Sequence, residues 1–90
     1  MFVVACYDVT DDRLRSRVAA LFEEAGMRVQ KSVFECLLSE RELHELTNRT
    51  ALILADGDQA RFYQLCAKCV AKARQHGGPP LYSEPLLYLV

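Results

Sequence analysis

The first strand of the chain constrains the fold more than any other stretch. Residues 2–7 read Phe-Val-Val-Ala-Cys-Tyr without a charge, and Asp8 follows where the strand would leave the sheet. An uncharged run of this kind predicts a strand covered on both faces, as at the centre of a sheet. An ionised carboxylate next to such a run is costly unless it is solvated, paired or bound to a cation. Asp8 is therefore the first candidate for a functional residue, either as a metal ligand or as an acceptor for the helix start that follows.

Two helices are predicted from periodicity and capping signals. Thr10 or Asp11 can cap the first, and Gly26 is a plausible residue to end it. Ser39 and Glu42 form a capping box at the start of the second. The predicted inner face of the first helix is Leu14, Val18, Leu21, Phe22 and Ala25, and that of the second is Leu43, Leu46, Thr50, Ile53 and Leu54.

Extended segments are predicted between and after these helices. Residues 27–30 and 32–38 are rich in β-branched and aromatic residues, and the pattern leaves open whether a hairpin or a kink joins them at 30–32. Residues 59–65 alternate like a strand with one solvated face, and 66–76 form either a short helix or an irregular arm. The resulting order predicts an α+β fold, a ferredoxin-like βαββαβ sandwich with an extra C-terminal strand.

The C-terminal tail predicts assembly of more than one copy. Residues 86–90 read Leu-Leu-Tyr-Leu-Val, after a break at Gly77-Gly78-Pro79-Pro80. An apolar strand without a polar side is an aggregation hazard unless it is covered, and the simplest cover is a second copy of the chain. We therefore expect a ferredoxin-like domain over 1–78 and a tail strand within 79–90 that is exchanged or packed at a homodimer interface. The alternative is a tail packed against its own sheet.

Composition excludes some classes of protein. No apolar run approaches the roughly 20 residues of a membrane-spanning helix, and no signal peptide is recognisable, so a cytoplasmic protein is expected. The net charge of −1 does not by itself indicate a nucleic-acid binder, although basic residues cluster in 13–31 and in 61–74.

The four cysteines are expected to be reduced thiols. Cys6 and Cys36 fall within apolar strand patterns and are expected in the core. Cys66 and Cys69 have the spacing of a zinc-ligand pair. A structural zinc site needs four ligands, and His76 is the one further candidate nearby. We predict that this pair carries no zinc.

Two stretches together make the sequence recognisable. Residues 7–18 read Tyr-Asp-Val-Thr-Asp-Asp-Arg-Leu-Arg-Ser-Arg-Val, and residues 26–36 read Gly-Met-Arg-Val-Gln-Lys-Ser-Val-Phe-Glu-Cys. With Asp-Gln-Ala-Arg-Phe-Tyr at 58–63, this pattern resembles the CRISPR-associated Cas2 family, small proteins that act with the CRISPR integrase when new spacers are acquired. The resemblance covers nearly the whole chain in the right order.

The resemblance implies a homodimer, a partner integrase and a metal-dependent endonuclease acting on RNA or double-stranded DNA. Asp8 matches the family's metal-binding aspartate, with Mg²⁺ or Mn²⁺ as the cofactor, and Tyr7 joins it as a catalytic candidate. Ser32 belongs to the stretch 26–36 that carries the resemblance. The residues expected to contact nucleic acid are Arg13, Arg15, Arg17, Arg28, Lys31 and Phe34.

Alternatives remain open at this point. Asp11 and Asp12 are expected to be used at the helix start, and no histidine lies near Asp8 in the sequence to act as a general base. A non-catalytic dimeric scaffold that binds duplex DNA and bridges integrase dimers is therefore a second hypothesis. A related toxin-type ribonuclease is a third, and a small-ligand regulatory module would need a pocket that the sequence does not indicate.

Overall fold

Four strands and three helices follow one another along residues 1–78, the part of the chain that this computed structural model describes. The strands are β1 (Phe2–Asp8), β2 (Gly26–Gln30), β3 (Val33–Leu37) and β4 (Gln59–Leu65). The helices are α1 (Asp12–Ala25), α2 (Glu40–Ile53) and α3 (Ala67–Ala71). The predicted tail strand over 86–90 lies outside the described residues, as does the whole tail segment 79–90.

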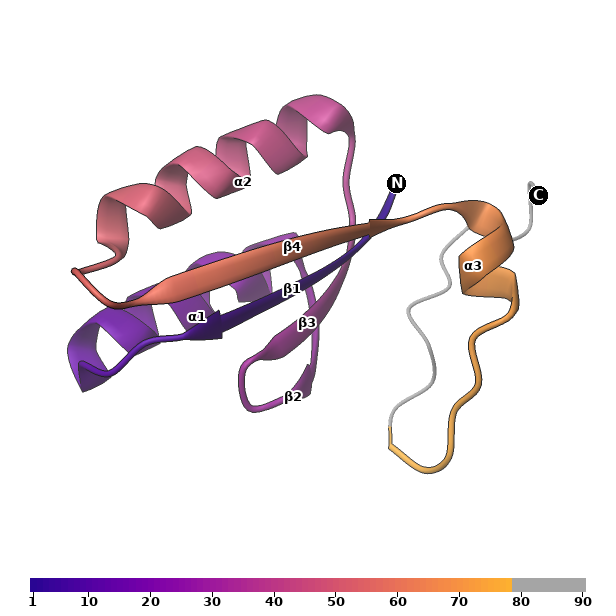
Figure 1. Cartoon of the computed structure of the whole chain (residues 1–90), viewed down its shortest axis with the longest axis horizontal. Helices are drawn as coiled ribbons and strands as arrows, with labels where there is room; N and C mark the ends of the chain where they lie inside the picture. Colours follow the sequence, from indigo (N-terminus) through magenta and orange to yellow (C-terminus); the bar gives the residue numbers. More distant parts are fainter. Residues whose placement is uncertain (79–90) are drawn as a thin grey trace.

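The four strands form one antiparallel sheet in the order β2-β3-β1-β4. β1 is central, as its uncharged sequence predicted, with Phe2 opposite Leu65 and Asp8 opposite Gln59 on β4. This order, with α1 between β1 and β2 and α2 between β3 and β4, is the predicted ferredoxin-like arrangement. Figure 1 shows β4 beside β1 and the chain leaving β4 toward α3, away from the end where β1 meets α1.

The core lies between one face of the sheet and the two long helices. Val3, Ala5 and Tyr7 alternate along β1 and join a cluster with buried side chains of α1 and α2. Phe22 and Phe34 pack edge to face at its centre, with ring centroids 5.6 Å apart. The alternate side chains of β1, Val4, Cys6 and Asp8, project from the opposite face of the sheet.

Helices α1 and α2 begin at the predicted residues, and α1 also ends at the predicted Gly26, but for a different reason than expected. Asp11 caps α1 by accepting a hydrogen bond from the Leu14 N–H at 2.9 Å, and Ser39 and Glu42 make the predicted capping box. Gly26 ends α1 in an extended conformation, with φ −171°, which any residue can adopt. A Cβ at Gly26 would meet the backbone of Glu35 and the Cα of Cys36, so close packing against β3 accounts for the glycine here.

The segment at 30–32 is a hairpin. β2 and β3 pair antiparallel around a turn at Lys31 and Ser32, with a register irregularity between Arg28 and Gln30. The Tyr7 N–H donates to the Ser32 carbonyl at 3.2 Å, which ties the turn to the end of β1. The hairpin turn therefore lies beside Asp8, although 23 or more residues separate them in the sequence.

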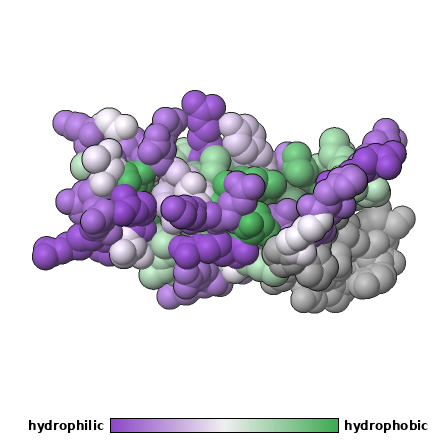
Figure 2. Space-filling view, turned by 90° about the horizontal axis from the view of Figure 1, so that it is seen from below, coloured by the Kyte–Doolittle hydropathy of each residue, from purple (hydrophilic) through white to green (hydrophobic). Residues whose placement is uncertain are grey.

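The surface is strongly hydrophilic at the end where β1 runs into α1, the left end of Figure 2. Along residues 1–78, no helix is long and apolar enough to cross a membrane.

Candidate functional site

A cleft of about 500 Å³ lies where the end of β1, the start of α1 and the β2–β3 turn meet. It brings together five of the residues predicted for the site, and it leaves three others outside its lining. The residues that line it are Tyr7, Asp8, Val9, Arg15, Ser16, Ala19, Arg28, Lys31 and Ser32. Its walls therefore carry one carboxylate and three basic side chains.

Asp8 is the last residue of β1, and its side chain is exposed. It lines this cleft and also a second hollow of about 210 Å³ beside Gln59 and Arg61 on β4. Within residues 1–78 its carboxylate makes no hydrogen bond or ion pair. Asp8 does not accept from the start of α1, because Asp11 provides that cap. A solvated carboxylate without a structural partner remains available for a ligand.

Arg15 fixes the loop that follows Asp8. Its Nη1 donates to the carbonyls of Val9 and Thr10, at 3.1 and 3.3 Å, and its Nη2 pairs with Asp12. The predicted use of Asp11 and Asp12 at the helix start is thus confirmed. With these bonds Arg15 acts mainly as a positioning residue for the loop, and its side chain is still half-exposed at the cleft.

Asp58 is a supporting residue that the sequence did not reveal. Its Oδ1 accepts from the Thr10 N–H at 3.2 Å and its Oδ2 accepts from the Ala55 N–H at 3.0 Å. One carboxylate thereby joins the turn before β4 to the loop after β1. In the sequence Asp58 is only the first residue of the stretch 58–63 that carries the resemblance, because its long-range partner depends on the pairing of β1 with β4.

Replacing Asp58 with alanine should destabilise the protein by about 1–2 kcal/mol, because two backbone donors lose a charged acceptor. Urea unfolding would measure the loss, and Asp58→Asn should recover part of it. Asp56→Ala, at an exposed position of the same turn, is the matched control and should be nearly neutral. Equal losses in the two alanine variants would contradict this role for Asp58.

Tyr7 and Arg28 line one side of the cleft, and Phe34 packs beneath them. Tyr7 is 7% exposed and its hydroxyl donates to the Lys31 carbonyl at 3.2 Å, so it holds the hairpin turn in place. The guanidinium of Arg28 lies over the Phe34 ring, 5.1 Å from its centroid, and pairs with Glu23 at 3.3 Å.

Phe34 requires a correction. It was predicted to contact nucleic acid, but its side chain is 0% exposed, packed against Tyr7 and Phe22. A ring closed off from solvent within one chain cannot stack on a base. Its observed contact is with Arg28, which it supports from beneath.

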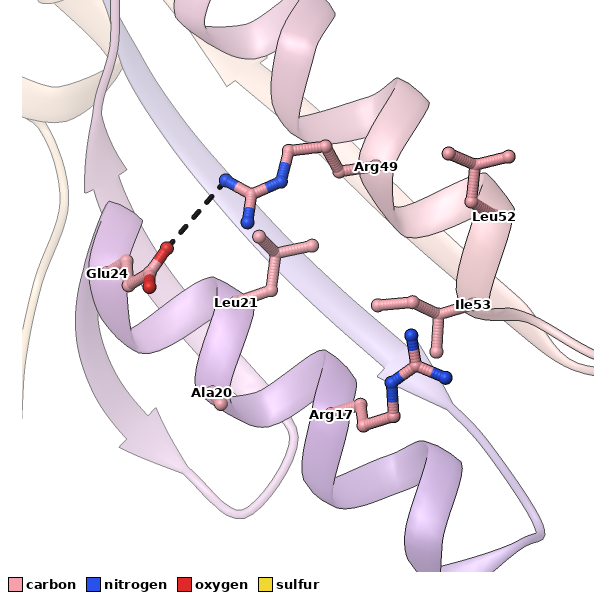
Figure 3. A pocket seen from close by; sticks show the side chains of 7 residues that line it. All are labelled: Arg17, Ala20, Leu21, Glu24, Arg49, Leu52 and Ile53. Atoms are coloured by element: carbon pink, nitrogen blue, oxygen red, sulfur yellow. Dashed lines mark ion pairs between the residues drawn. The ribbon is translucent and has the colours of Figure 1, made fainter.

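The remaining basic candidates lie in different places. Lys31 is exposed at the hairpin turn and lines the cleft, whereas Arg13 is exposed on α1 outside it. Arg17 faces a groove between α1 and α2, with Glu24, Arg49 and Leu52 among its other lining residues, as Figure 3 shows. The spacing of Arg13 and Arg17 along the helix therefore does not bring both to Asp8.

The donor set at Asp8 fits a hard divalent cation that is held mostly by water. Mg²⁺ commonly takes one or two protein carboxylates, with waters and substrate phosphate filling its octahedron. Asp8 supplies one solvated carboxylate. No group of three or more His, Cys, Asp or Glu side chains that could hold a metal occurs among residues 1–78. One chain thus offers a minimal ligand set, which a second copy would double.

Comparisons with known proteins agree in one family. The family model described as CRISPR associated protein Cas2 matches residues 1–73. A Synechocystis sp. protein named CRISPR-associated endoribonuclease Cas2 3 is 42% identical over 94% of this chain and 92% of its own length. The structure of Streptococcus pyogenes Cas2 is similar, with a TM-score of 0.74 and 31% identity over 86% of this chain and all of that one. A chain of a partial Cas6-RT-Cas1–Cas2 complex matches with a TM-score of 0.74 and 27% identity, covering 90% of both chains.

Proposed function

The chain belongs to the CRISPR-associated Cas2 family, and from this premise we propose that it acts in the acquisition of new CRISPR spacers, in complex with an integrase. Within that role we propose an endonuclease site at Asp8 that acts on RNA or double-stranded DNA with Mg²⁺ or Mn²⁺. The names of relatives as endoribonucleases support cleavage of RNA. A similar chain in a complex with Cas1 supports an integrase as the partner.

The observation that carries the endonuclease proposal is the exposed carboxylate of Asp8 in a cleft with basic walls. Arg28 and Lys31 can attract a phosphate, while Asp8 is not engaged by any described side chain. Such a combination of one free carboxylate and basic groups suits the joint binding of a cation and a phosphodiester.

Asp8 would hold the cation, and the surrounding residues would place the substrate. When bound, Mg²⁺ supplies a water of lowered pKa and polarises a phosphoryl oxygen. Arg28, held by Phe34 and Glu23, would stabilise charge that develops on the phosphate oxygens. Tyr7 and Arg15 act on the geometry, since their hydrogen bonds go to the backbone around the cleft.

Cleavage assays with the purified full chain test this proposal. We expect slow cutting of RNA or duplex DNA that requires Mg²⁺ or Mn²⁺ and stops with EDTA. Protein free of contaminating nuclease that cuts neither substrate over a range of pH and metals would overturn the enzymatic part. The spacer-acquisition role would then be tested separately, by integration with the reconstituted integrase complex.

A scaffold without catalysis is the second candidate, and the composition of the cleft favours it. The residues that line the cleft include one carboxylate and no histidine, so this chain offers no evident general base. In the scaffold role the basic side chains would bind duplex DNA, and two copies would bridge integrase dimers. Integration that persists when cleavage is lost would support this candidate.

Homodimerisation through the tail is part of both proposals. β4 is at one edge of the sheet that the described strands form, a position where a further strand can pair. Deleting residues 85–90 should weaken the dimer, because the apolar strand that would cover this edge is lost. Light scattering at micromolar concentration would measure the effect, with a thermal melt to show that the fold persists. An unchanged dimer mass would contradict the role of the tail.

Binding of duplex DNA should fall steeply with salt, because each neutralised phosphate releases counterions. The double variant Arg13→Ala/Lys31→Ala removes two exposed cations that have no ion pair within residues 1–78. The slope of log K against log salt should become shallower by about 2, at roughly 0.9 for each phosphate contact. Arg41→Ala, at the other end of the molecule near the start of α2, is the control. A slope that is flat, or equal in all three proteins, would contradict the electrostatic prediction.

A further inference from the structure

The two exposed cysteines lie together at the start of α3. Cys66 is the N-cap residue and Cys69 is in the first turn, and their Sγ atoms are 3.5 Å apart. The other two cysteines are less accessible: Cys6 is half-buried and Cys36 is buried. Burial raises the pKa of the Cys36 thiol to about 11, so that thiol is unreactive near neutral pH.

The two thiols of this pair differ in their chemistry. The backbone N–H and the thiol of Cys69 both favour the thiolate of Cys66, and they lower its pKa. The same thiol–thiol contact raises the pKa of Cys69. From these directions we expect Cys66 to be the thiol that attacks first and Cys69 the thiol that reacts second.

The pair is separate from the candidate site at Asp8. α3 follows the end of β4, where Leu65 pairs with Phe2, whereas Asp8 pairs with Gln59 at the opposite end of the same two strands. Val70, which follows Cys69 directly, is 3% exposed, and its burial anchors α3. Two thiols alone do not complete a structural zinc site, and residues 1–78 supply no third ligand to them.

We propose that Cys66 and Cys69 form a reversible thiol–disulfide site that exchanges with low-molecular-weight disulfides of the glutathione class. The Cys66 thiolate attacks one sulfur of the disulfide and releases one glutathione thiolate, which leaves a mixed disulfide at Cys66. Cys69 then loses its proton and attacks Cys66 Sγ, releasing the second glutathione. The protein loses two electrons and two protons, which the disulfide gains as two thiols.

The geometry requires little movement for this second step. A disulfide bond is about 2.05 Å long, so the two sulfurs must approach by roughly 1.5 Å. Both side chains are exposed and can rotate toward each other without displacing the core. The bond would join the residue directly after β4 to the first turn of α3. In a reducing compartment, such a bond would form only transiently, as expected of a redox-responsive site.

To test this proposal, the reduced full chain is incubated with oxidised glutathione. The reaction is quenched with acid and the products are measured by mass spectrometry. The intact protein should lose two hydrogen atoms and should carry no glutathione at equilibrium. Trypsin cleaves after Arg61, Lys68 and Lys72, so the product should join peptide 62–68 to peptide 69–72 by a bond that a reductant removes. Cys6 and Cys36 should remain free for alkylation.

Single variants distinguish the roles of the two thiols. Cys69→Ser should stop at a stable mixed disulfide on Cys66, and Cys66→Ser should react about tenfold more slowly. Cys6→Ala is the matched control and should behave as the wild type does. A wild-type chain that stays reduced, accumulates only mixed disulfides or links Cys6 would overturn the proposal. So would stoichiometric zinc in the purified protein by elemental analysis, since we predict none.

Discussion

Replacing Asp8 with alanine should abolish Mg²⁺-dependent cleavage while the protein still folds and dimerises. The carboxylate is exposed and makes no hydrogen bond or ion pair among the described residues, so its removal leaves no protein donor unpaired. Its loss removes the one carboxylate of the cleft, and with it the ligand that a cation would need. Cleavage assays with Mg²⁺ and with EDTA, together with a thermal melt, would measure both effects.

Asp56→Ala is the matched control for this experiment, because it removes the same charge from an exposed turn outside the cleft. It should retain cleavage. Integration by the reconstituted complex should be retained in both variants if the cleavage site is separate from the scaffold role. A loss of about 1–3 kcal/mol in Asp8→Ala would instead indicate a structural acceptor. Cleavage that survives the change would remove Asp8 from the proposed site.

Replacing Gly26 with alanine should cost about 1–3 kcal/mol or more of folding free energy, because it forces a methyl group into a closed space. A Cβ there would lie 2.8 Å from the Cα of Cys36 and 2.7 Å from its Sγ, and it would also meet the carbonyl oxygen of Glu35. Two of these three contacts are with backbone atoms, which cannot rotate away. β2 would have to separate from β3, and Arg28 would move with it. Urea unfolding would measure the loss of stability.

The double variant Gly26→Ala/Cys36→Ala separates side-chain from backbone crowding. Removing the sulfur relieves one of the three contacts. We therefore expect Gly26→Ala to cost only slightly less stability in the Cys36→Ala background than in the wild type. Since the φ angle of Gly26 is −171°, strain in a left-handed conformation cannot account for the cost. Full recovery in the double variant, or a neutral Gly26→Ala, would show that β2 and β3 adapt more easily than their packing indicates.

Much of the fold could be predicted, since local signals and tertiary packing agree. The uncharged run of β1 gave its central place, and the capping box at Ser39 and Glu42 is formed as predicted. The hairpin at 30–32 could not be decided, because Gln30, Lys31 and Ser32 carry no strong turn signal. What holds that turn is its tie to Tyr7, which lies elsewhere in the sequence.

The site was predictable in part. Asp8, Arg15, Arg28 and Lys31 do line one cleft, although their functional roles remain predictions. Phe34 could not be placed from the sequence, because an aromatic residue in a short strand suits either face of a sheet. Asp58 escaped prediction for a different reason: its acceptor role depends on the register of β1 with β4, about fifty residues apart in the chain.

The central position of β1 also has a consequence for how the protein is made. β1 precedes both of its neighbours in the sequence, and the second of them, β4, ends only at Leu65. During synthesis the backbone N–H and C=O groups of β1 therefore stay hydrogen-bonded to water until β3 and β4 have been made. Pairing between strands so far apart in the sequence slows folding. The contact that joins the loop after Asp8 to the turn before β4 can form only when Asp58 reaches Thr10. The candidate site thus takes its final shape only after the turn before β4 has been synthesised.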